Sequence, residues 1–128
     1  MEKRIRLVNK LDREFSQVIR RVSALGSKDK LSTCFTCGKR DHWKNMDCGH
    51  FMPRRHMATR WDLENAEAQC RECNSFKGGM QDIFAERLGP KAEQLRIQAH
   101  ETRKYELHEL EDMLENLVKL NKRINGYF

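Results

Sequence analysis

Long apolar runs are absent from this 128-residue sequence, which has no stretch near the about 18–20 apolar residues that cross a bilayer. The opening stretch MEKRIRLVNK is largely charged and lacks the apolar run of a secretory signal. Proline and glycine are scarce, with 2 and 7 residues, while hydrophobic residues reach 38%. These features argue against a membrane, secreted or disordered protein, and we expect a cytoplasmic one. The length fits one domain with a helical extension.

Acidic residues are too few to balance the basic ones, because 25 Lys and Arg stand against 19 Asp and Glu and leave a net charge of +6. Residues 1–33 hold 9 basic and 4 acidic residues, whereas residues 81–128 hold 8 and 9. A basic excess in the first part of the chain suits a polyanionic partner such as nucleic acid. A generic basic protein would have the same composition, so charge alone leaves both interpretations open.

An amphipathic helix is predicted for residues 3–25, within an N-terminal segment of residues 1–26. Its apolar residues recur at alternating steps of three and four and therefore share one face, which we expect to pack in the core. They are Val8, Leu11, Phe15, Val18, Val22 and Leu25. Gly26 then provides a natural helix stop. The arginines on the rest of the helix, which we consider as DNA contacts, are Arg4, Arg6, Arg13, Arg20 and Arg21.

A long C-terminal helix is predicted for residues 91–125, after a break at Gly89-Pro90. Its second half has apolar residues at the a and d positions of heptads, with one polar Asn that could fix the register. These positions are Leu107, Leu110, Leu114, Leu117, Asn121 and Ile124. The seam could join two copies of the chain in a homodimer, or it could pack on the N-terminal helix. Two or so heptads are too few to decide.

The five cysteines are more decisive than charge. Four of them form two C-x-x-C pairs, Cys34 with Cys37 and Cys70 with Cys73. Four thiolates at this spacing can surround a zinc ion as a closed tetrahedral site that holds a fold together. The 47 residues from 34 to 80 contain both pairs and are barely enough to fold without such support, so we predict a structural zinc that staples a core over residues 27–88. The 32 residues between Cys37 and Cys70 exceed the about 15–20 of a compact zinc module, so further structure must lie between the pairs.

The residues around these pairs resemble a known family. The order of a C-x-x-C pair, Gly49-His50, a midway Asn65, and a second C-x-x-C pair followed by Asn74 is similar to that of the HNH (ββα-metal) nucleases. More narrowly, Cys34-Phe-Thr-Cys37-Gly38, Asp47-Cys-Gly-His-Phe51, Thr59-Arg-Trp-Asp-Leu63 and Gln69-Cys-Arg-Glu-Cys-Asn74 resemble the lambdoid phage NinG (Rap) recombination nucleases. The resemblance covers roughly residues 8–90.

This resemblance implies an α+β fold, mostly α, in which a zinc-stapled ββα-metal core lies between an N-terminal helix and a long C-terminal helix. It also implies three catalytic roles. His50 would be the general base that takes a proton from the attacking water, for which an imidazole pKa near 6.5 is suited. Asn65 would hold the loop that orients the histidine. Asn74 would ligate a divalent cation, Mg²⁺ or Mn²⁺, that stabilises the leaving oxygen.

One position departs from the family pattern. Many HNH enzymes have an Asp metal ligand immediately before the catalytic His, where this chain has Gly49. Asp47 is two residues earlier and shares a strand face with Gly49, so it could reach the same cation. Asp62, or a shell completed by water, would be an alternative ligand. Cys48 and His50 could instead form a second zinc pair.

The function implied by the resemblance is a metal-dependent DNA endonuclease of phage recombination, with a preference for branched DNA such as Holliday junctions and D-loops. Basic residues around the predicted site would contact phosphates, which positions DNA without reading its sequence. They are Arg54, Arg55, Arg60 and Lys77. The same residues also fit a zinc-binding module that binds nucleic acid without cutting it. A third interpretation is a helical adaptor that binds a recombination partner.

Overall fold

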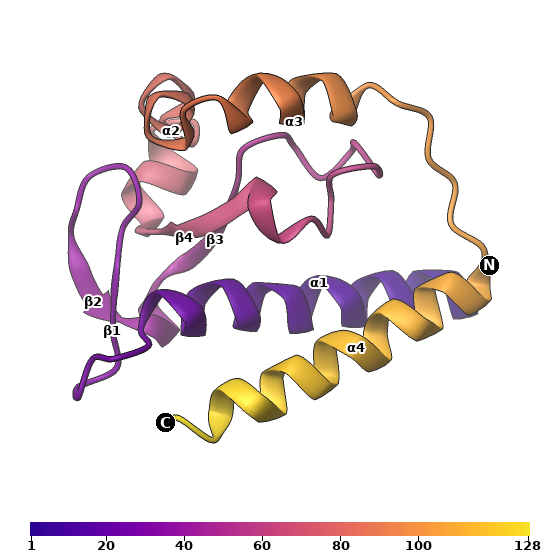
Figure 1. The fold of residues 1–128 in the computed structure, drawn as a ribbon, viewed down its shortest axis with the longest axis horizontal. Coiled ribbons are helices and arrows are strands. Elements are labelled where there is room, and N and C mark those ends of the chain that lie inside the picture. Colours follow the sequence, from indigo (N-terminus) through magenta and orange to yellow (C-terminus); the bar gives the residue numbers. More distant parts are fainter.

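The protein is described by a computed structural model that covers all 128 residues. It has an α+β fold that is mostly helical, as predicted, with two small antiparallel sheets. The helices are α1 (Glu2–Ser23), α2 (Gln81–Leu88), α3 (Lys91–Ala99) and α4 (Leu107–Asn125), and the strands are β1 (Leu31–Thr33), β2 (Arg40–His42), β3 (Asp47–His50) and β4 (Ala66–Gln69). Helix α1 lies between α4 and the β3–β4 sheet, and α2 and α3 lie beyond that sheet (Figure 1). None of the helices has the length and apolar character needed to cross a membrane.

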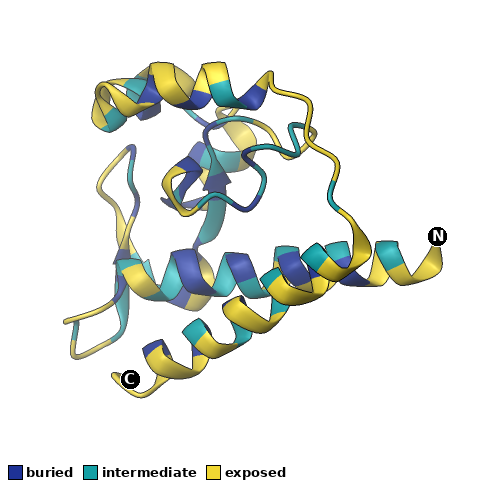
Figure 2. Ribbon diagram, turned by 45° about the vertical axis from the view of Figure 1, so that its right-hand side comes forward, coloured by how far each residue is buried: buried dark blue, intermediate teal, exposed yellow.

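The largest part of the core lies around α1. Leu11, Phe15 and Val18 of α1 are almost completely buried, and they pack with Leu110 of α4 and with Trp61. Buried, intermediate and exposed residues alternate along the ribbon of α1 (Figure 2). The predicted apolar face was displaced at its ends. Leu7 and Ile19 are buried, although the prediction omitted them. Val22 and Leu25 are predicted as core residues, but they are 49% and 41% exposed. The helix ends at Ser23, two residues before its predicted end, and Leu25 lies in the turn that follows it.

The C-terminal seam packs on α1 within the chain, and a homodimer stays a prediction. Leu110, Leu117 and Ile124 are buried in the same cluster as the apolar residues of α1. Asn121 is also buried, and its amide donates hydrogen bonds to the Glu14 carbonyl at 3.0 Å and to the Glu14 carboxylate at 2.5 Å. The polar position in the heptads therefore fixes the register of α4 against α1. Of the two arrangements that the heptads allowed, the structure has the intramolecular one.

The prediction of one continuous helix over residues 91–125 is wrong. The chain leaves the helix after Ala99 and is irregular until α4 begins at Leu107. A capping box starts the second helix, because the Glu109 carboxylate accepts the Glu106 backbone N–H at 2.6 Å and the Glu106 carboxylate accepts that of Glu109. Helix α3 packs through Leu95 on the far side of the sheet, in a cluster separate from that of α4. The break lets the chain cross from one layer to the other.

Two short hairpins bring the cysteine pairs together. Strand β1 pairs with β2, and the turn between them carries Cys34 and Cys37. Strand β3 pairs with β4, which ends immediately before Cys70. The Phe35 backbone N–H donates to the Ala68 carbonyl at 2.9 Å and so joins the turn of the first hairpin to the end of the second.

Candidate functional site

The four cysteines of the two pairs form one cluster. All four Sγ atoms lie within 4.8 Å of one another, and those of Cys37 and Cys70 are 3.7 Å apart. A tetrahedral zinc with bonds of about 2.3 Å requires sulfur separations of about 3.8 Å, so the cluster fits a zinc ion. Backbone N–H groups support the sulfurs, since Lys39 donates to Cys37 Sγ and Cys73 donates to Cys70 Sγ. The predicted four-cysteine site is therefore present as a cluster that could hold zinc.

The fifth cysteine is not part of this cluster. Cys48 lies on β3 with its side chain partly buried against the α1 core. Burial raises the pKa of the Cys48 thiol to about 12, so the thiol stays protonated at neutral pH. No group of three or more metal-ligating side chains includes Cys48 or His50. The alternative of a second zinc pair at these two residues therefore has no further ligands to complete it.

A polar groove of about 610 Å³ brings together three of the residues predicted for catalysis or cation binding. His50, Asp47 and Asn74 all line it, and α1 forms one wall. The charged residues of its lining are Asp12, Arg20, Lys44, Asp47, Arg54 and Arg71. A larger hollow of about 810 Å³ lies between α1, β1 and β4, but it is mainly apolar and contains none of the predicted catalytic residues. The groove is therefore the candidate site.

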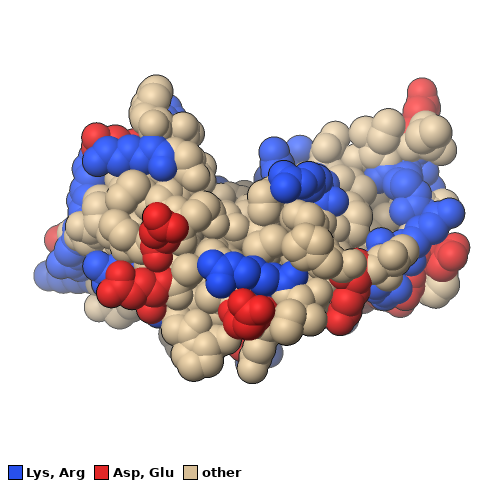
Figure 3. Space-filling view, turned by 90° about the horizontal axis from the view of Figure 1, so that it is seen from above, with Lys and Arg blue, Asp and Glu red and all other residues tan.

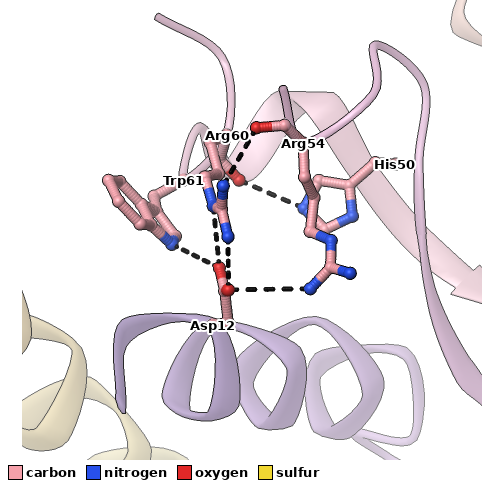
Figure 4. Close-up of polar contacts among 5 residues, drawn as sticks. All are labelled: Asp12, His50, Arg54, Arg60 and Trp61. Carbon is pink, nitrogen blue, oxygen red and sulfur yellow. Dashed lines mark hydrogen bonds and ion pairs between the residues drawn. The ribbon is translucent and has the colours of Figure 1, made fainter. Parts of the chain in front are cut away.

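His50 is the last residue of β3, and one of its ring nitrogens is already bonded. Its Nε2 lies 3.1 Å from the Arg60 carbonyl, and a carbonyl can only accept, so Nε2 carries the proton. The neutral ring then has an unprotonated Nδ1, which lies on the side of the ring away from this carbonyl (Figure 4). Burial, with smaller contributions from the Arg54 and Arg60 charges, lowers the pKa of His50, although the Arg60 carbonyl and Asp12 act in the opposite direction. The imidazole is therefore neutral and able to accept a proton at neutral pH.

Asn65 lies outside the groove and holds the chain just after His50. It is fully buried, and its side-chain amide pairs with both backbone groups of one residue. The Met52 N–H donates to Asn65 Oδ1 at 2.9 Å, and Asn65 Nδ2 donates to the Met52 carbonyl at 3.0 Å. The Phe51 N–H also donates to the Asn65 carbonyl at 2.8 Å. The side chain thus fixes the direction in which the loop leaves β3.

Asp47 and Asn74 meet in the groove. Asn74 belongs to a π-helical turn, Glu72–Phe76, that follows the second cysteine pair, and its Nδ2 donates to Asp47 Oδ2 at 3.2 Å. Carboxylate and amide oxygens are donors of the kind that Mg²⁺ prefers. The assignment of Asp47 and Asn74 to a divalent cation stays a prediction. Asp62 does not line the groove, because its carboxylate caps a short 3₁₀ turn and accepts the Gln98 amide.

Packing explains why residue 49, where many HNH enzymes have an Asp, is a glycine in this chain. Any side chain there would overlap the Gln69 amide, which is fully buried. Gln69 Nε2 donates to Thr36 Oγ1 and to the Gly79 carbonyl, so the glutamine joins the first cysteine turn to the segment after the second pair. Local packing thus excludes a metal ligand at residue 49.

The predicted DNA contacts have different environments. Arg54 lines the groove and its side chain is 61% exposed. Arg60 does not face DNA, because its guanidinium is only 18% exposed and is held by both oxygens of Asp12. Arg55 is exposed outside the groove lining, and Lys77 pairs with Glu72 at 3.7 Å.

Other basic side chains line the groove. Arg20, which belongs to the arginines predicted as exposed contacts on the first helix, lines it together with Lys44 and Arg71. On the face seen in Figure 3, by contrast, Lys and Arg side chains lie in separate groups with Asp and Glu between them. Sequence analysis missed Lys44 and Arg71, and it also missed Asp12. Its partners Arg60 and Trp61 are 48 and 49 positions away, so no local spacing could indicate the contact.

The fold and the site define a small α+β protein with a four-cysteine cluster that could hold zinc and a polar groove. The chain belongs to the NinG family, because residues 1–125 match the family described as bacteriophage lambda NinG protein. Comparison with curated proteins found no match. Comparison with solved structures found none either.

Proposed function

We propose that this protein is a metal-dependent DNA endonuclease that hydrolyses phosphodiester bonds in the polar groove. The observation that carries the proposal is that His50, with its Nε2 occupied and its Nδ1 unprotonated, shares one groove with the Asp47–Asn74 pair. A general base and a pair of oxygen ligands in one groove are the parts that hydrolysis of a phosphodiester needs. The HNH-like order of these residues supports the same reaction.

Each part of the groove has a task in this proposal. Arg54 and Arg71 are exposed and cationic, and they would hold the phosphates on either side of the scissile bond. His50 Nδ1 would accept a proton from the water that attacks phosphorus, while the Arg60 carbonyl retains the proton on Nε2. A divalent cation held by Asp47 and Asn74 would supply positive charge for the leaving oxygen. The four-cysteine centre would hold the fold and take no part in hydrolysis.

The substrate in this proposal is branched DNA of recombination, such as four-way junctions and D-loops. The resemblance to phage recombination nucleases is the main support for this substrate. The groove supports it further, because its cations suit phosphate contacts, which read the shape of DNA rather than its sequence.

Cleavage of end-labelled four-way junctions, D-loops, linear duplex and single strands, with and without Mg²⁺ or Mn²⁺, tests the proposal. The zinc-loaded wild-type protein should cut the branched substrates only with a divalent cation. His50→Ala should lower the cleavage rate by about 100-fold or more while zinc content and DNA affinity persist. His108→Ala is the matched control, because this histidine is exposed on α4 and does not line the groove.

Two results would overturn the proposal. If His50→Ala and His108→Ala cleave equally well, the activity does not use the groove. If the wild-type protein binds DNA but cuts none of the substrates with either cation, the protein is a zinc-binding nucleic-acid module instead.

A further inference from the structure

Asp12 of α1 makes an unusual number of polar contacts with a segment far away in the sequence. Its Oδ2 accepts Arg60 Nη2 at 2.6 Å and its Oδ1 accepts Arg60 Nε at 3.1 Å. The same Oδ1 accepts the Trp61 indole N–H at 2.9 Å, and Arg54 Nη1 lies 3.6 Å from Oδ2 (Figure 4). One carboxylate on a helix thus holds three residues of the loop between β3 and β4.

The same loop contains the carbonyl oxygen that accepts the hydrogen bond from His50 Nε2. The Arg60 guanidinium donates to Asp12, and the Arg60 backbone carbonyl accepts from His50 Nε2. The Arg60 guanidinium also donates to the Arg54 carbonyl at 3.2 Å and so closes the loop on itself. Movement of the Arg60 backbone would therefore release the imidazole proton from its acceptor, and the proton could then reside on either nitrogen.

The contacts require an ionised carboxylate at Asp12. Burial alone would raise the pKa of Asp12, but hydrogen bonds from Arg60 and Trp61 and the charges of Arg60 and Arg54 outweigh burial and lower it. The Asp12 and Arg60 side chains are only 17% and 18% exposed. Loss of the carboxylate would leave the Arg60 guanidinium largely buried without its partner, which favours movement of the loop toward water.

We infer that Asp12 is a positioning residue of the groove, which holds the Arg60 backbone so that His50 keeps its proton on Nε2 and presents an unprotonated Nδ1 to substrate. This inference rests on the proposed function for its effect on cleavage, but its effect on the imidazole is measurable without any cleavage. A role in stability alone would leave the imidazole unchanged in every variant that folds.

The test compares three variants of the full, zinc-loaded chain. Asp12→Asn keeps the shape of the side chain and removes its charge. Arg60→Lys keeps the positive charge and removes the forked pair of hydrogen bonds. Glu14→Gln is the matched control, because Glu14 is another α1 carboxylate with a partner on a distant element, Asn121, but it does not line the groove.

The direct readout is the protonation of the two ring nitrogens of His50. Histidine labelled with nitrogen-15 in the ring reports it by NMR, and His50→Ala identifies the signals of His50. Wild type and Glu14→Gln should show the proton on Nε2 alone, whereas Asp12→Asn and Arg60→Lys should show both tautomers. In single-turnover cleavage the same two variants should be slower by about 100-fold, as expected for a misplaced base, with DNA affinity within about threefold.

Each outcome decides the inference. A proton that stays on Nε2 in Asp12→Asn and Arg60→Lys overturns it, whatever the cleavage rates are. If Asp12→Asn fails to fold, Arg60→Lys alone gives the answer. If wild type cuts no DNA, the proposed function fails, and the tautomers of His50 still show whether Asp12 positions the imidazole.

Discussion

DNA binding in the groove should weaken steeply as salt is raised, because four cationic side chains line it. They are Arg20, Lys44, Arg54 and Arg71. If each neutralises one phosphate, the logarithm of affinity should fall with the logarithm of salt at a slope of about −3.6. Raising salt from about 50 mM to about 200 mM would then weaken binding about 150-fold. Fluorescence anisotropy of labelled duplex with His50→Ala protein, without divalent cation, measures the slope in the absence of cleavage.

Substitution of one groove cation should reduce this slope by a predictable amount. Arg71 is the best choice because its side chain is 73% exposed and its one ion pair, with Asp47, is long at 4.0 Å. Arg71→Gln should give a slope of about −2.7, so the same change in salt weakens binding only about 40-fold. Lys119→Gln is the control, because Lys119 is exposed on α4, pairs with Glu115 and does not line the groove. A slope shallower than about −2 for the His50→Ala protein, or equal changes when Arg71→Gln and Lys119→Gln are added to it, would refute this assignment of phosphate contacts.

Three further predictions concern the metal centre, the strand beside it and the histidine. Cys70→Ser should abolish the binding of one zinc per chain, measured by metal analysis, and the cooperative thermal transition, whereas Cys48→Ala should keep the zinc. Gly49→Ala should lower the free energy of unfolding by about 3 kcal/mol through overlap with Gln69, and a denaturant double-mutant cycle with Gln69→Ala should recover part of the loss; additive effects would contradict the overlap. Because burial lowers the pKa of His50, cleavage should persist on acidification to a midpoint below the ordinary value of 6.5, and Arg54→Gln should raise that midpoint; an unchanged midpoint would show that Arg54 does not act on the imidazole.

The features that local sequence patterns predicted are those governed by local chemistry. The two cysteine pairs converge as their spacing indicated, and Asp47 meets Asn74 in the groove, where the strand argument placed it. Long-range packing decided the rest. The face of α1 has two partners, the sheet and α4, so its buried stripe includes Leu7 and Ile19, whereas Val22 and Leu25 of the predicted seam are exposed.

The main failures of sequence analysis occurred where a residue's partner is distant along the chain. The sequence around Arg60 gives no sign of its partner, because Asp12 lies 48 positions away on α1. The interrupted C-terminal helix is a second case. Its signal was weak, since the break depends on a capping box formed by two glutamates, a pattern easily mistaken for the charged surface of a continuous helix.

Because α1 packs on α4, the groove depends on a helix that is synthesised after all the residues that line it. A nascent chain that has not yet reached Leu107 has α1 but lacks the buried leucines, the isoleucine and Asn121 that anchor it from the other side. Since α1 is also a wall of the groove and carries Asp12, that wall would be loosely held during synthesis until α4 emerges. The groove would then be complete only once α4 has been made, and premature stop codons within α4 would impair it without touching any residue of the groove.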